Sequence, residues 1–527
     1  MKKFFRNLFS GYFLILFMLL IELAIVIYVQ FFLDDVVLKH VDSESKASLI
    51  IALSYIGFKL IAFIIEVIIF FKIINKFEAP DFKTPWIVGM LLLPVFFSVL
   101  FLIFANHGLR RRDKRIVKAT HQAYRDFFKI KEEKKLDYDH KLGNAVGTFK
   151  YINKITELGF HEHNKVYYYK TGEEFFPDMM KYLREAQEFI FMEFFIISDG
   201  ALWNEVTKIL IEKAEAGLDV RLIYDDMGCG GTISAKTPKK LRKHGIKCYK
   251  FHPFRPILSG VYNNRDHRKI VIVDHKYGFT GGMNLADEYG NIITRFGYWK
   301  DTMVRIEGSA ISNLISTFLQ NYNLCAGYVS DYKKYLDYEY PIFDEEGFVM
   351  PFGDGPGGID NALIGEQTFI NMLHAAKNFA YISTPYLIPT YQLLDAMRNA
   401  SLRGVEVHLI LPGIPDKKMV YMVAESHFPC LLEAGVHIHI YNPGFNHMKT
   451  VLVDSELAFV GTINFDFRSL VHHFECGTIL YKNPCLKIIE EDFKEMIDKS
   501  VLVPANFKLS KRKGRLCSII KLIEPLL

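Results

Sequence analysis

"HRKIVIVD" at residues 267–274 and "HMKTVLVD" at residues 447–454 are two copies of one motif, with a histidine, a lysine and an aspartate at the same spacing. Each copy is followed by a second matching stretch, "TGGMN" (280–284) and "VGTIN" (460–464). The apolar runs have strand character, and side chains two residues apart leave the same face of a strand. The histidine and lysine of each copy are therefore predicted to point to one place.

The repeat extends beyond the motifs. "LREAQEFIFM" (183–192) matches "LHAAKNFAYI" (373–382), and in both a helix end runs into an apolar strand. Strands that alternate with helices of ten or more residues are typical of α/β proteins. We therefore predict two α/β sandwich domains, residues 119–330 and 331–510, related by a pseudo-twofold axis.

A pseudo-twofold axis would bring both motifs into one site. Two lysines and two asparagines provide donors suited to phosphate oxygens, so a phosphodiester is the natural substrate. One imidazole can attack phosphorus while the other protonates the leaving alkoxide and later deprotonates the acceptor. No metal or other cofactor is implied, because the lysines and asparagines already supply positive potential. The candidate residues are His267, Lys269, Asn284, His447, Lys449 and Asn464.

Four acidic residues accompany this set. A nucleophilic imidazole works best when its other nitrogen donates to a carboxylate that fixes the tautomer. Asp301 in "YWKDTMVRIEG" and Glu475 in "HHFECG" are the candidates for this orienting role, with an ordinary salt bridge or a solvated loop as the alternative. Asp274 and Asp454, which end the motifs, are expected to fix the local backbone and domain interface.

The first part of the chain differs in composition. Apolar blocks at about 11–33, 48–71 and 86–105 each reach the ~20 residues that a bilayer core requires. The first block is too long for the apolar region of a signal peptide and has no small-residue cleavage site after it. Residues 1–118 are therefore predicted to be a membrane anchor with two or three transmembrane helices. Pro94 allows a hairpin in the third block.

Charge patterns bear on location and partners. Three full crossings would place "RRRDKR" (110–115) outside, against the positive-inside rule, so a hairpin is favoured, with the catalytic domain on the cytoplasmic face of the cell membrane. The tail at 511–527 combines basic and apolar residues and is read either as a contact with anionic lipid or as an exposed tail. A net charge of +5 on 527 residues argues against nucleic acid as a partner. Oligomeric state is not predicted.

The two motifs resemble the signature of the phospholipase D superfamily, H-x-K-x-x-x-x-D followed by G-x-x-N in two copies. "STPYLIP", "VGTINFDFRS" and the terminal "IIKLIEPLL" extend the resemblance to the bacterial cardiolipin synthases. It implies a phosphatidyltransferase: one phosphatidylglycerol gives its phosphatidyl group to a histidine, and a second accepts it, yielding cardiolipin and glycerol. It assigns the chemistry to the two motifs, with Asp274 and Asp454 completing them.

The resemblance leaves two matters open. His267 is favoured as nucleophile and His447 as acid and base, although the sequence symmetry does not separate them. Hydrolysis of phospholipids, and with less support a phosphodiesterase or nuclease activity, are the alternative functions.

The chain also departs from the family's pattern. His473 stands where relatives usually have asparagine, and Met303 stands where histidine is common. The first half has Gly282 where the second has Thr462. The two half-sites are therefore expected not to be equivalent.

Overall fold

The computed structural model of the chain divides into two compact units, Met1–His107 with Phe254–Tyr262, and Gly108–Pro253 with Asn263–Leu527. The described residues are 46–76, 80–104, 111–129, 139–253, 263–356 and 362–521.

Three described helices belong to the first unit: α4 (Lys46–Asn75), α5 (Pro80–Leu92) and α6 (Pro94–Phe104). The apolar block at 86–105 is not one helix. It breaks before Pro94, which has no N–H to continue the helical hydrogen bonds. Helix α6 folds back, so that the rings of Trp86 and Phe101 lie 5.5 Å apart. The third apolar block is therefore a helical hairpin.

Two expectations for this unit concern membrane spans. The block at 11–33 lies outside the described residues. Within the described parts of the chain, no helix combines the length and apolar character needed to cross a membrane.

The second unit contains two large sheets, and the first is built from residues of the first half. Its strands β3, β4 and β5 are parallel and the other neighbours are antiparallel. In spatial order the strands are β2 (Lys165–Tyr169), β9 (Met303–Glu307), β7 (Tyr277–Gly281), β6 (Ile270–Val273), β3 (Phe189–Phe194), β4 (Asp219–Asp225) and β5 (Lys247–Phe251).

The second sheet repeats this order, with one extra strand at each edge. Strands β11, β13 and β14 are parallel, and the other neighbours are antiparallel. In spatial order its strands are β1 (His161–Glu162), β10 (Phe348–Asp354), β19 (Glu475–Tyr481), β17 (Leu457–Gly461), β16 (Thr450–Val453), β11 (Phe379–Ser383), β13 (Glu406–Pro412), β14 (His437–Tyr441) and β20 (Ser500–Leu502).

The helices repeat as well. In the first half they are α10 (Gly172–Glu185), α11 (Ala201–Glu215), α12 (Thr237–Lys243) and α13 (Ile311–Ala326). In the second half they are α15 (Ile364–Ala375), α16 (Tyr391–Leu402), α17 (Lys418–Glu425), α18 (Phe428–Glu433) and α19 (Cys485–Asp498). Helices α11 and α16 are both followed by a glycine with φ of +95°, Gly217 and Gly404, a conformation that glycine adopts without strain. The predicted α/β class is confirmed.

Further helices and short strands complete the unit. They are α7 (Arg111–Lys129), α8 (Asp139–Leu142), α9 (Val146–Thr156), α14 (Tyr332–Leu336), α20 (Lys511–Ile520), β8 (Tyr298–Lys300), β12 (Leu387–Ile388), β15 (Gly444–Asn446) and β18 (Phe465–Asp466). Helix α20, from the predicted tail, packs on α17: Cys517 is buried, and Lys513 pairs with Glu425 at 2.8 Å.

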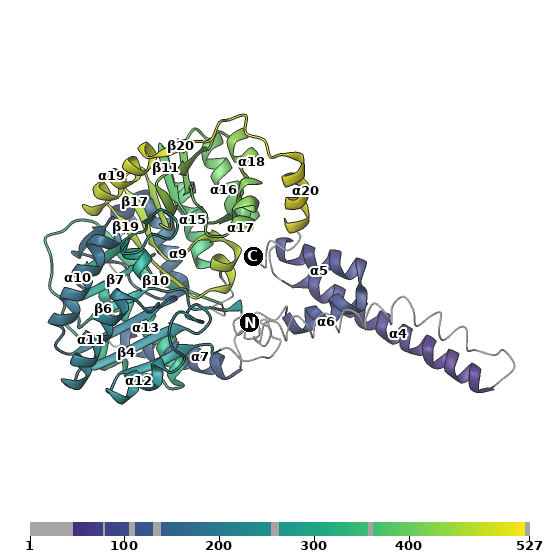
Figure 1. Cartoon of the computed structure of the whole chain (residues 1–527), viewed down its shortest axis with the longest axis horizontal. Helices are drawn as coiled ribbons and strands as arrows, with labels where there is room; N and C mark the ends of the chain where they lie inside the picture. The colour runs from purple at the N-terminus through teal and green to yellow at the C-terminus, as the bar shows by residue number, and fades with distance from the viewer. Residues whose placement is uncertain are drawn as a thin grey trace. The chain divides into compact units, whose positions relative to one another are not determined.

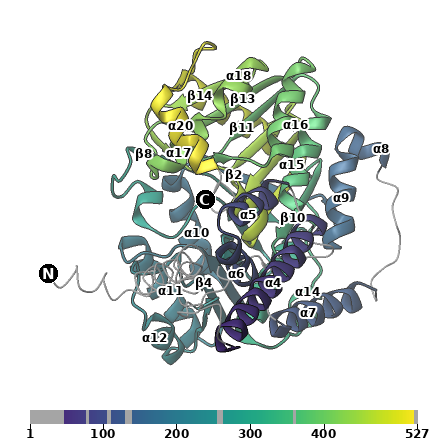
Figure 2. The ribbon, with the colours of Figure 1, turned by 90° about the vertical axis from the view of Figure 1, so that its right-hand side faces the viewer.

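Figure 1 shows the two halves of the second unit as two lobes, with α11 and β4 in one and α16 and β20 in the other. Figure 2 shows the same division from the side. Helix α13 buries almost all of its residues and contacts β6 and β3 of one sheet and β10 of the other. The sheets also contact each other through β7, β17 and β19. The hydrophobic core therefore runs between the lobes and holds them together.

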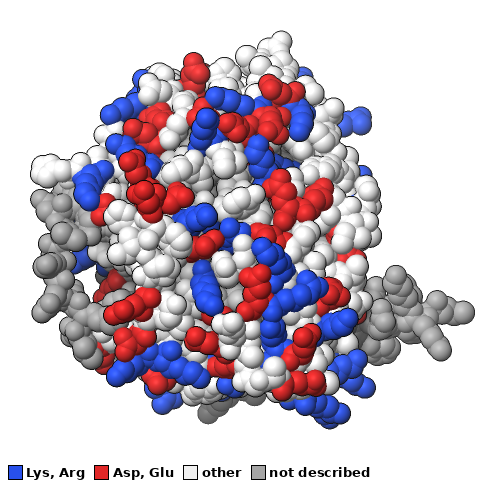
Figure 3. All heavy atoms as spheres, turned by 90° about the vertical axis from the view of Figure 1, so that its left-hand side faces the viewer, with Lys and Arg blue, Asp and Glu red and all other residues white. Residues whose placement is uncertain are grey.

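Figure 3 shows the face on the left of Figure 1, where lysine and arginine side chains are interspersed with acidic ones.

Candidate active site

Strand order places the predicted site residues at one end of each sheet. His267 and Lys269 directly precede β6, and Asn284 follows β7, which is antiparallel to β6. Asp301 precedes β9, antiparallel to β7. The start of β6, the end of β7 and the start of β9 therefore share one edge. The second half repeats the arrangement with β16, β17 and β19.

Each histidine pairs with a carboxylate from the opposite half of the chain. Nδ1 of His267 lies 2.9 Å from both carboxylate oxygens of Glu475. Nδ1 of His447 lies 2.5 Å from Oδ2 of Asp301. All four side chains are buried, and each carboxylate fixes its histidine with Nε2 free for chemistry. Each lobe thus supplies the carboxylate that orients the histidine of the other lobe.

Backbone pairing between the lobes explains this crossed arrangement. Strands β8 and β15 pair in parallel and end immediately before Asp301 and His447. Asp266 and Phe474 form a parallel bridge immediately before His267 and Glu475. The amide of each histidine donates across the interface at 2.8 Å, to the carbonyl of the residue that precedes its carboxylate partner. The interface itself therefore sets the register of both pairs.

Two buried lysines lie beside the histidines. Lys269 donates to the carbonyl of His267 at 2.6 Å, and Lys449 donates to that of His447. Burial lowers the pKa of Lys269 to about 8 and that of Lys449 to about 7, against the raising effects of Glu475 and Asp301 respectively. An anion entering the site would favour their charged forms, so both are prepared to bind a phosphate.

The charged groups of the two motifs lie close enough to shift each other's pKa values. Burial holds the pKa of His267 well below its usual value, and the charges of Lys269, Lys449 and His447 lower it further. Burial, and after it the charges of Lys449 and Lys269, also hold the pKa of His447 well below its usual value. Burial raises the pKa of Asp301 to about 6, while Lys449 opposes that rise. Groups of both halves therefore act on each other directly.

The two asparagines are buried at the same edge but differ in their contacts. Asn284 accepts the amide of Ile196 at 2.9 Å and donates to the hydroxyl of Tyr289 at 2.7 Å. Oδ1 of Asn464 has no hydrogen-bond partner among the described residues. Asn284 is thus fixed by the protein, whereas Asn464 keeps hydrogen-bonding capacity for a ligand.

The motif aspartates hold the backbone. Asp274 accepts the amides of residues 187–189, and Asp454 accepts those of residues 377–379, at distances between 2.7 and 3.3 Å. Both residues have positive φ, 52° and 51°, which aspartate tolerates in tight turns. Each ties the turn after a motif strand to the start of β3 or β11.

The sequence asymmetry at Gly282 and Thr462 has a physical reason. A Cβ on Gly282 would collide with the carboxylate of Asp301. In the other half, the hydroxyl of Thr462 donates to Oε2 of Glu475. Asp301 thus requires a glycine beside its carboxylate, whereas the carboxylate of Glu475 is held by the hydroxyl of Thr462.

His473 also lies beside this network. One ligand atom each from His267, His473 and Glu475 lies within 4.8 Å of the others. Among the described residues, these three therefore form a group with the spacing of metal ligands. Nδ1 of His267 already faces Glu475, so a cation there would compete with the orienting contact. Met303, the other departure from the family pattern, is buried at the start of β9.

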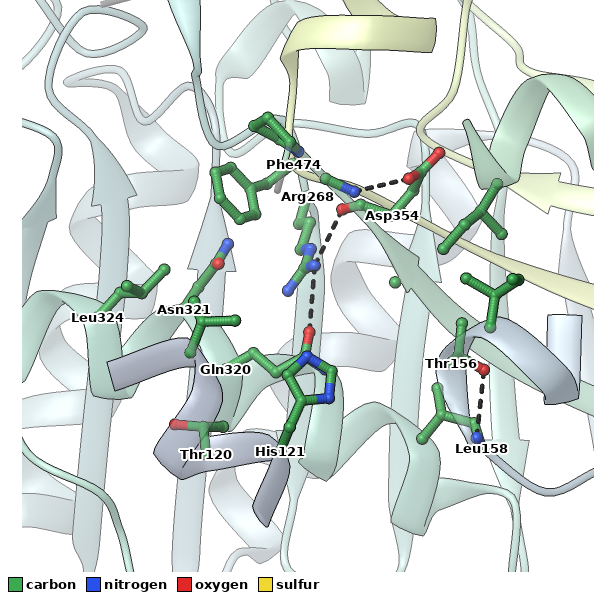
Figure 4. A pocket seen from close by; sticks show the side chains of 16 residues that line it. Thr120, His121, Thr156, Leu158, Arg268, Gln320, Asn321, Leu324, Asp354 and Phe474 are labelled. Carbon is green, nitrogen blue, oxygen red and sulfur yellow. Dashed lines mark hydrogen bonds between the residues drawn. The ribbon is translucent and has the colours of Figure 1, made fainter. Parts of the chain in front are cut away.

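Arg268, between the motif histidine and lysine, points away from them. It donates to the carbonyls of Glu475 at 3.0 Å, Thr317 at 2.8 Å and Asp354 at 3.1 Å. Its guanidinium lines a pocket of about 60 Å³ with His121 and Gln320, shown in Figure 4. None of the predicted site residues lines this pocket. Through its three hydrogen bonds to backbone carbonyls, Arg268 stabilises the interface between the lobes behind the site.

Sequence reasoning missed one cation near the site. Lys417, in the loop before α17, is exposed, and its charge lowers the pKa of both His267 and His447. Lys417 lies outside the repeated motifs. Its position in the loop after β13, the strand that corresponds to β4, is the feature of the sequence that could have indicated it.

Comparison with known proteins agrees with this geometry. A family model described as "Cardiolipin synthase, PLD-like domain" matches residues 179–318 and 369–497. An uncharacterized protein of Streptococcus mutans is 39% identical over 84% of this chain and 96% of its own length. A cardiolipin synthase of Alkalihalophilus pseudofirmus is 32% identical over 89% of this chain and 93% of its own. A cardiolipin synthase 2 of Bacillus cereus is 32% identical over 89% and 91%.

A solved structure shares the fold. The phosphatidylserine synthase of Haemophilus influenzae superposes with a TM-score of 0.56 at 14% identity, covering 72% of this chain and 100% of that one. Two halves with the same strand order, two motifs meeting between them and relatives over nearly the whole length lead to one assignment. The chain belongs to the family of cardiolipin synthases with phospholipase D-like domains.

Proposed function

We propose that this protein transfers a phosphatidyl group from one phosphatidylglycerol to a hydroxyl of another, releasing glycerol and forming cardiolipin. The observation that carries the proposal is the crossed pairing of two buried histidines with carboxylates of the opposite lobes, beside two buried lysines. That arrangement supplies a nucleophile, an acid and base, and phosphate-binding cations in one place.

In the first step the donor phosphate lies between the two histidines. His267 attacks phosphorus through Nε2 while Glu475 accepts the hydrogen bond from its Nδ1–H. The bond between phosphorus and the glycerol oxygen breaks, and His447 gives its Nε2 proton to that oxygen. Glycerol leaves, and the phosphatidyl group is held by a phosphorus–nitrogen bond.

In the second step the roles of His447 reverse. Its neutral Nε2 takes the proton from a hydroxyl of the second phosphatidylglycerol, whose oxygen attacks phosphorus. The phosphorus–nitrogen bond breaks, so His267 is free again and cardiolipin leaves. Water in place of the lipid hydroxyl would give phosphatidic acid from the same intermediate.

Electrostatics supports this order of events. In the free protein burial, and after it the charges of Lys449 and Lys269, lower the pKa of His447. A bound phosphodiester carries a negative charge that offsets those of Lys269 and Lys449. The imidazole can then carry the proton that the leaving glycerol needs.

We further propose that residues 1–118 anchor the protein in the cell membrane, with the domains at 119–330 and 331–510 on its cytoplasmic face and the tail at 511–527 near anionic lipid. In support, α4 exposes large apolar side chains along its length, including Leu53, Leu60, Phe63 and Phe71. Such a surface is costly in water and suits contact with lipid.

The test is a product assay. Purified full-length protein is given phosphatidylglycerol in detergent, and lipids and free glycerol are measured together. Cardiolipin and glycerol in equal amounts support the proposal. Phosphatidic acid as the main product would assign the protein to the hydrolases instead, and cleavage of plasmid DNA without lipid turnover would make it a nuclease.

A further inference from the structure

A third lysine lies close to the histidines but in a different environment. Lys269 and Lys449 are fully buried, whereas Lys417 is exposed. Nζ of Lys417 lies 4.8 Å from the ring centre of Tyr386, whose hydroxyl donates to Oδ2 of Asp416 at 2.6 Å. The partly buried tyrosine therefore holds the loop, and the charge of Lys417 lies over its ring.

The loop that carries Lys417 also presents two exposed apolar side chains, beside the carboxylate of Asp416. Ile414 and Met419 expose 43% and 58% of their surface. The loop is fixed where it starts, because the amides of Gly413 and Ile414 both donate to the carbonyl of Gly444, two residues before Asn446 at the end of β15. A cation on the same segment as two exposed apolar side chains matches the charged head and apolar body of a phospholipid.

Lys417 differs from its counterpart in the first half in its effect on the histidines. The loop that follows β4 in the first half begins "DMGCG" (226–230) and ends in an exposed lysine, Lys236, directly before α12. Asp226 there pairs with Lys250 at 2.7 Å, and Asp225 accepts the amides of the next residues. Of the two lysines that end these loops, Lys417 is the one whose charge lowers the pKa of both His267 and His447.

The proposed reaction brings two phosphates together. The donor phosphorus requires the buried lysines, because it is attacked there. The acceptor carries its own phosphate, separated from the attacking hydroxyl by the three carbons of glycerol. Two anions at this distance repel each other unless a further cation lies nearby. Water, as the acceptor in hydrolysis, has no such need.

We propose that Lys417 binds the phosphate of the acceptor phospholipid, with Ile414 and Met419 against its apolar part, and thereby selects an anionic lipid over water or a neutral alcohol as acceptor. The inference rests on the proposed function and adds to it the site of the second substrate.

The experiment compares two acceptors with the same donor. Full-length protein in detergent receives phosphatidylglycerol and radiolabelled glycerol. Exchange of label into phosphatidylglycerol reports transfer to a neutral alcohol, and cardiolipin reports transfer to the anionic lipid. For Lys417→Gln, the ratio of cardiolipin formed to glycerol exchanged should fall roughly tenfold, the effect of losing one hydrogen bond to a charged group. Lys417→Arg should restore most of the ratio.

Lys418→Gln is the matched control, because it removes the same charge from the neighbouring exposed position. Its ratio should equal that of the unmodified protein. The inference is wrong if Lys417→Gln leaves the ratio unchanged, lowers both reactions equally, or behaves as Lys418→Gln does. If the unmodified protein exchanges glycerol but forms no cardiolipin, the proposed function fails, and that result is distinct from any change in ratio.

Discussion

Glu475 and Asp301 hold equivalent histidines in opposite lobes, yet the two carboxylates are held differently. Glu475 meets His267 with both oxygens and also accepts the hydroxyl of Thr462. Asp301 meets His447 with one oxygen and uses the other to accept the amide of Thr302 at 2.8 Å. Duplication has thus kept the backbone and allowed the supports of each carboxylate to diverge, so that the two half-sites are distinct chemical environments.

Removing either histidine should have the largest effect. His267→Ala and His447→Ala should each lower kcat for cardiolipin formation by about 10³-fold or more, because both steps need a nucleophile and a proton carrier. The double variant should be little worse than either single one. Mass spectrometry of alkaline-quenched protein should find the phosphatidyl adduct on the peptide containing His267. An adduct on His447 would exchange the two assignments.

Neutralising the carboxylates tests their different supports. Glu475→Gln and Asp301→Asn should each cost about 10² to 10³-fold in kcat, because an amide does not stabilise the imidazolium or fix its tautomer. The KM for the lipid should change less than kcat, because the carboxylates contact the histidines whereas the lysines bind the phosphate. Activity within tenfold of the unmodified protein for either variant would show that its histidine needs no orienting partner.

Much of this comparison was predictable from sequence, and its central feature was not. The repeated spacing indicated the α/β class, the duplicated strands and the convergence of the motif histidines and lysines on one place. Asp301 and Glu475 were recognisable as carboxylates following each motif. Their exchange between lobes depends on how β8 pairs with β15 and Asp266 with Phe474. Such pairing arises from packing of the two halves and leaves no periodic signal in the chain.

The residues beside the carboxylates should have intermediate effects. Gly282→Ala should lower kcat by about 10²-fold, because the new methyl group displaces Asp301 from His447, and small misplacements of catalytic groups are costly. Thr462→Val should cost about tenfold, through loss of one hydrogen bond to Glu475. Thr462→Ser, which keeps the hydroxyl, is the control. The reverse order of the two effects would contradict the structural account of the asymmetry.

The pH dependence should reflect the same groups. Asp301 is ionised above its pKa of about 6, and the lysines are charged below about 7 for Lys449 and about 8 for Lys269. We therefore expect a bell-shaped kcat/KM, which falls below about pH 6 as Asp301 gains a proton and falls above pH 7 to 8 as the lysines lose theirs. Asp301→Asn should remove the acidic limb and move the basic one to lower pH, because Asp301 raises the pKa of Lys449 and of Lys269. A basic limb absent up to pH 9 would contradict the role given to the lysines.

His473→Asn should have the smallest effect, and this tests whether the extra histidine belongs to the chemistry. Burial lowers the pKa of His473 to about 3, so the ring is neutral wherever the protein is active. Its Nδ1 lies 3.5 Å from Glu475, beyond a good hydrogen bond, and its ring lies 5.4 Å from that of His267. A neutral ring with such contacts packs against the catalytic pair without transferring protons. Kinetic constants should change less than about threefold, and a loss above tenfold with a shifted acidic limb would instead make His473 a second partner of Glu475.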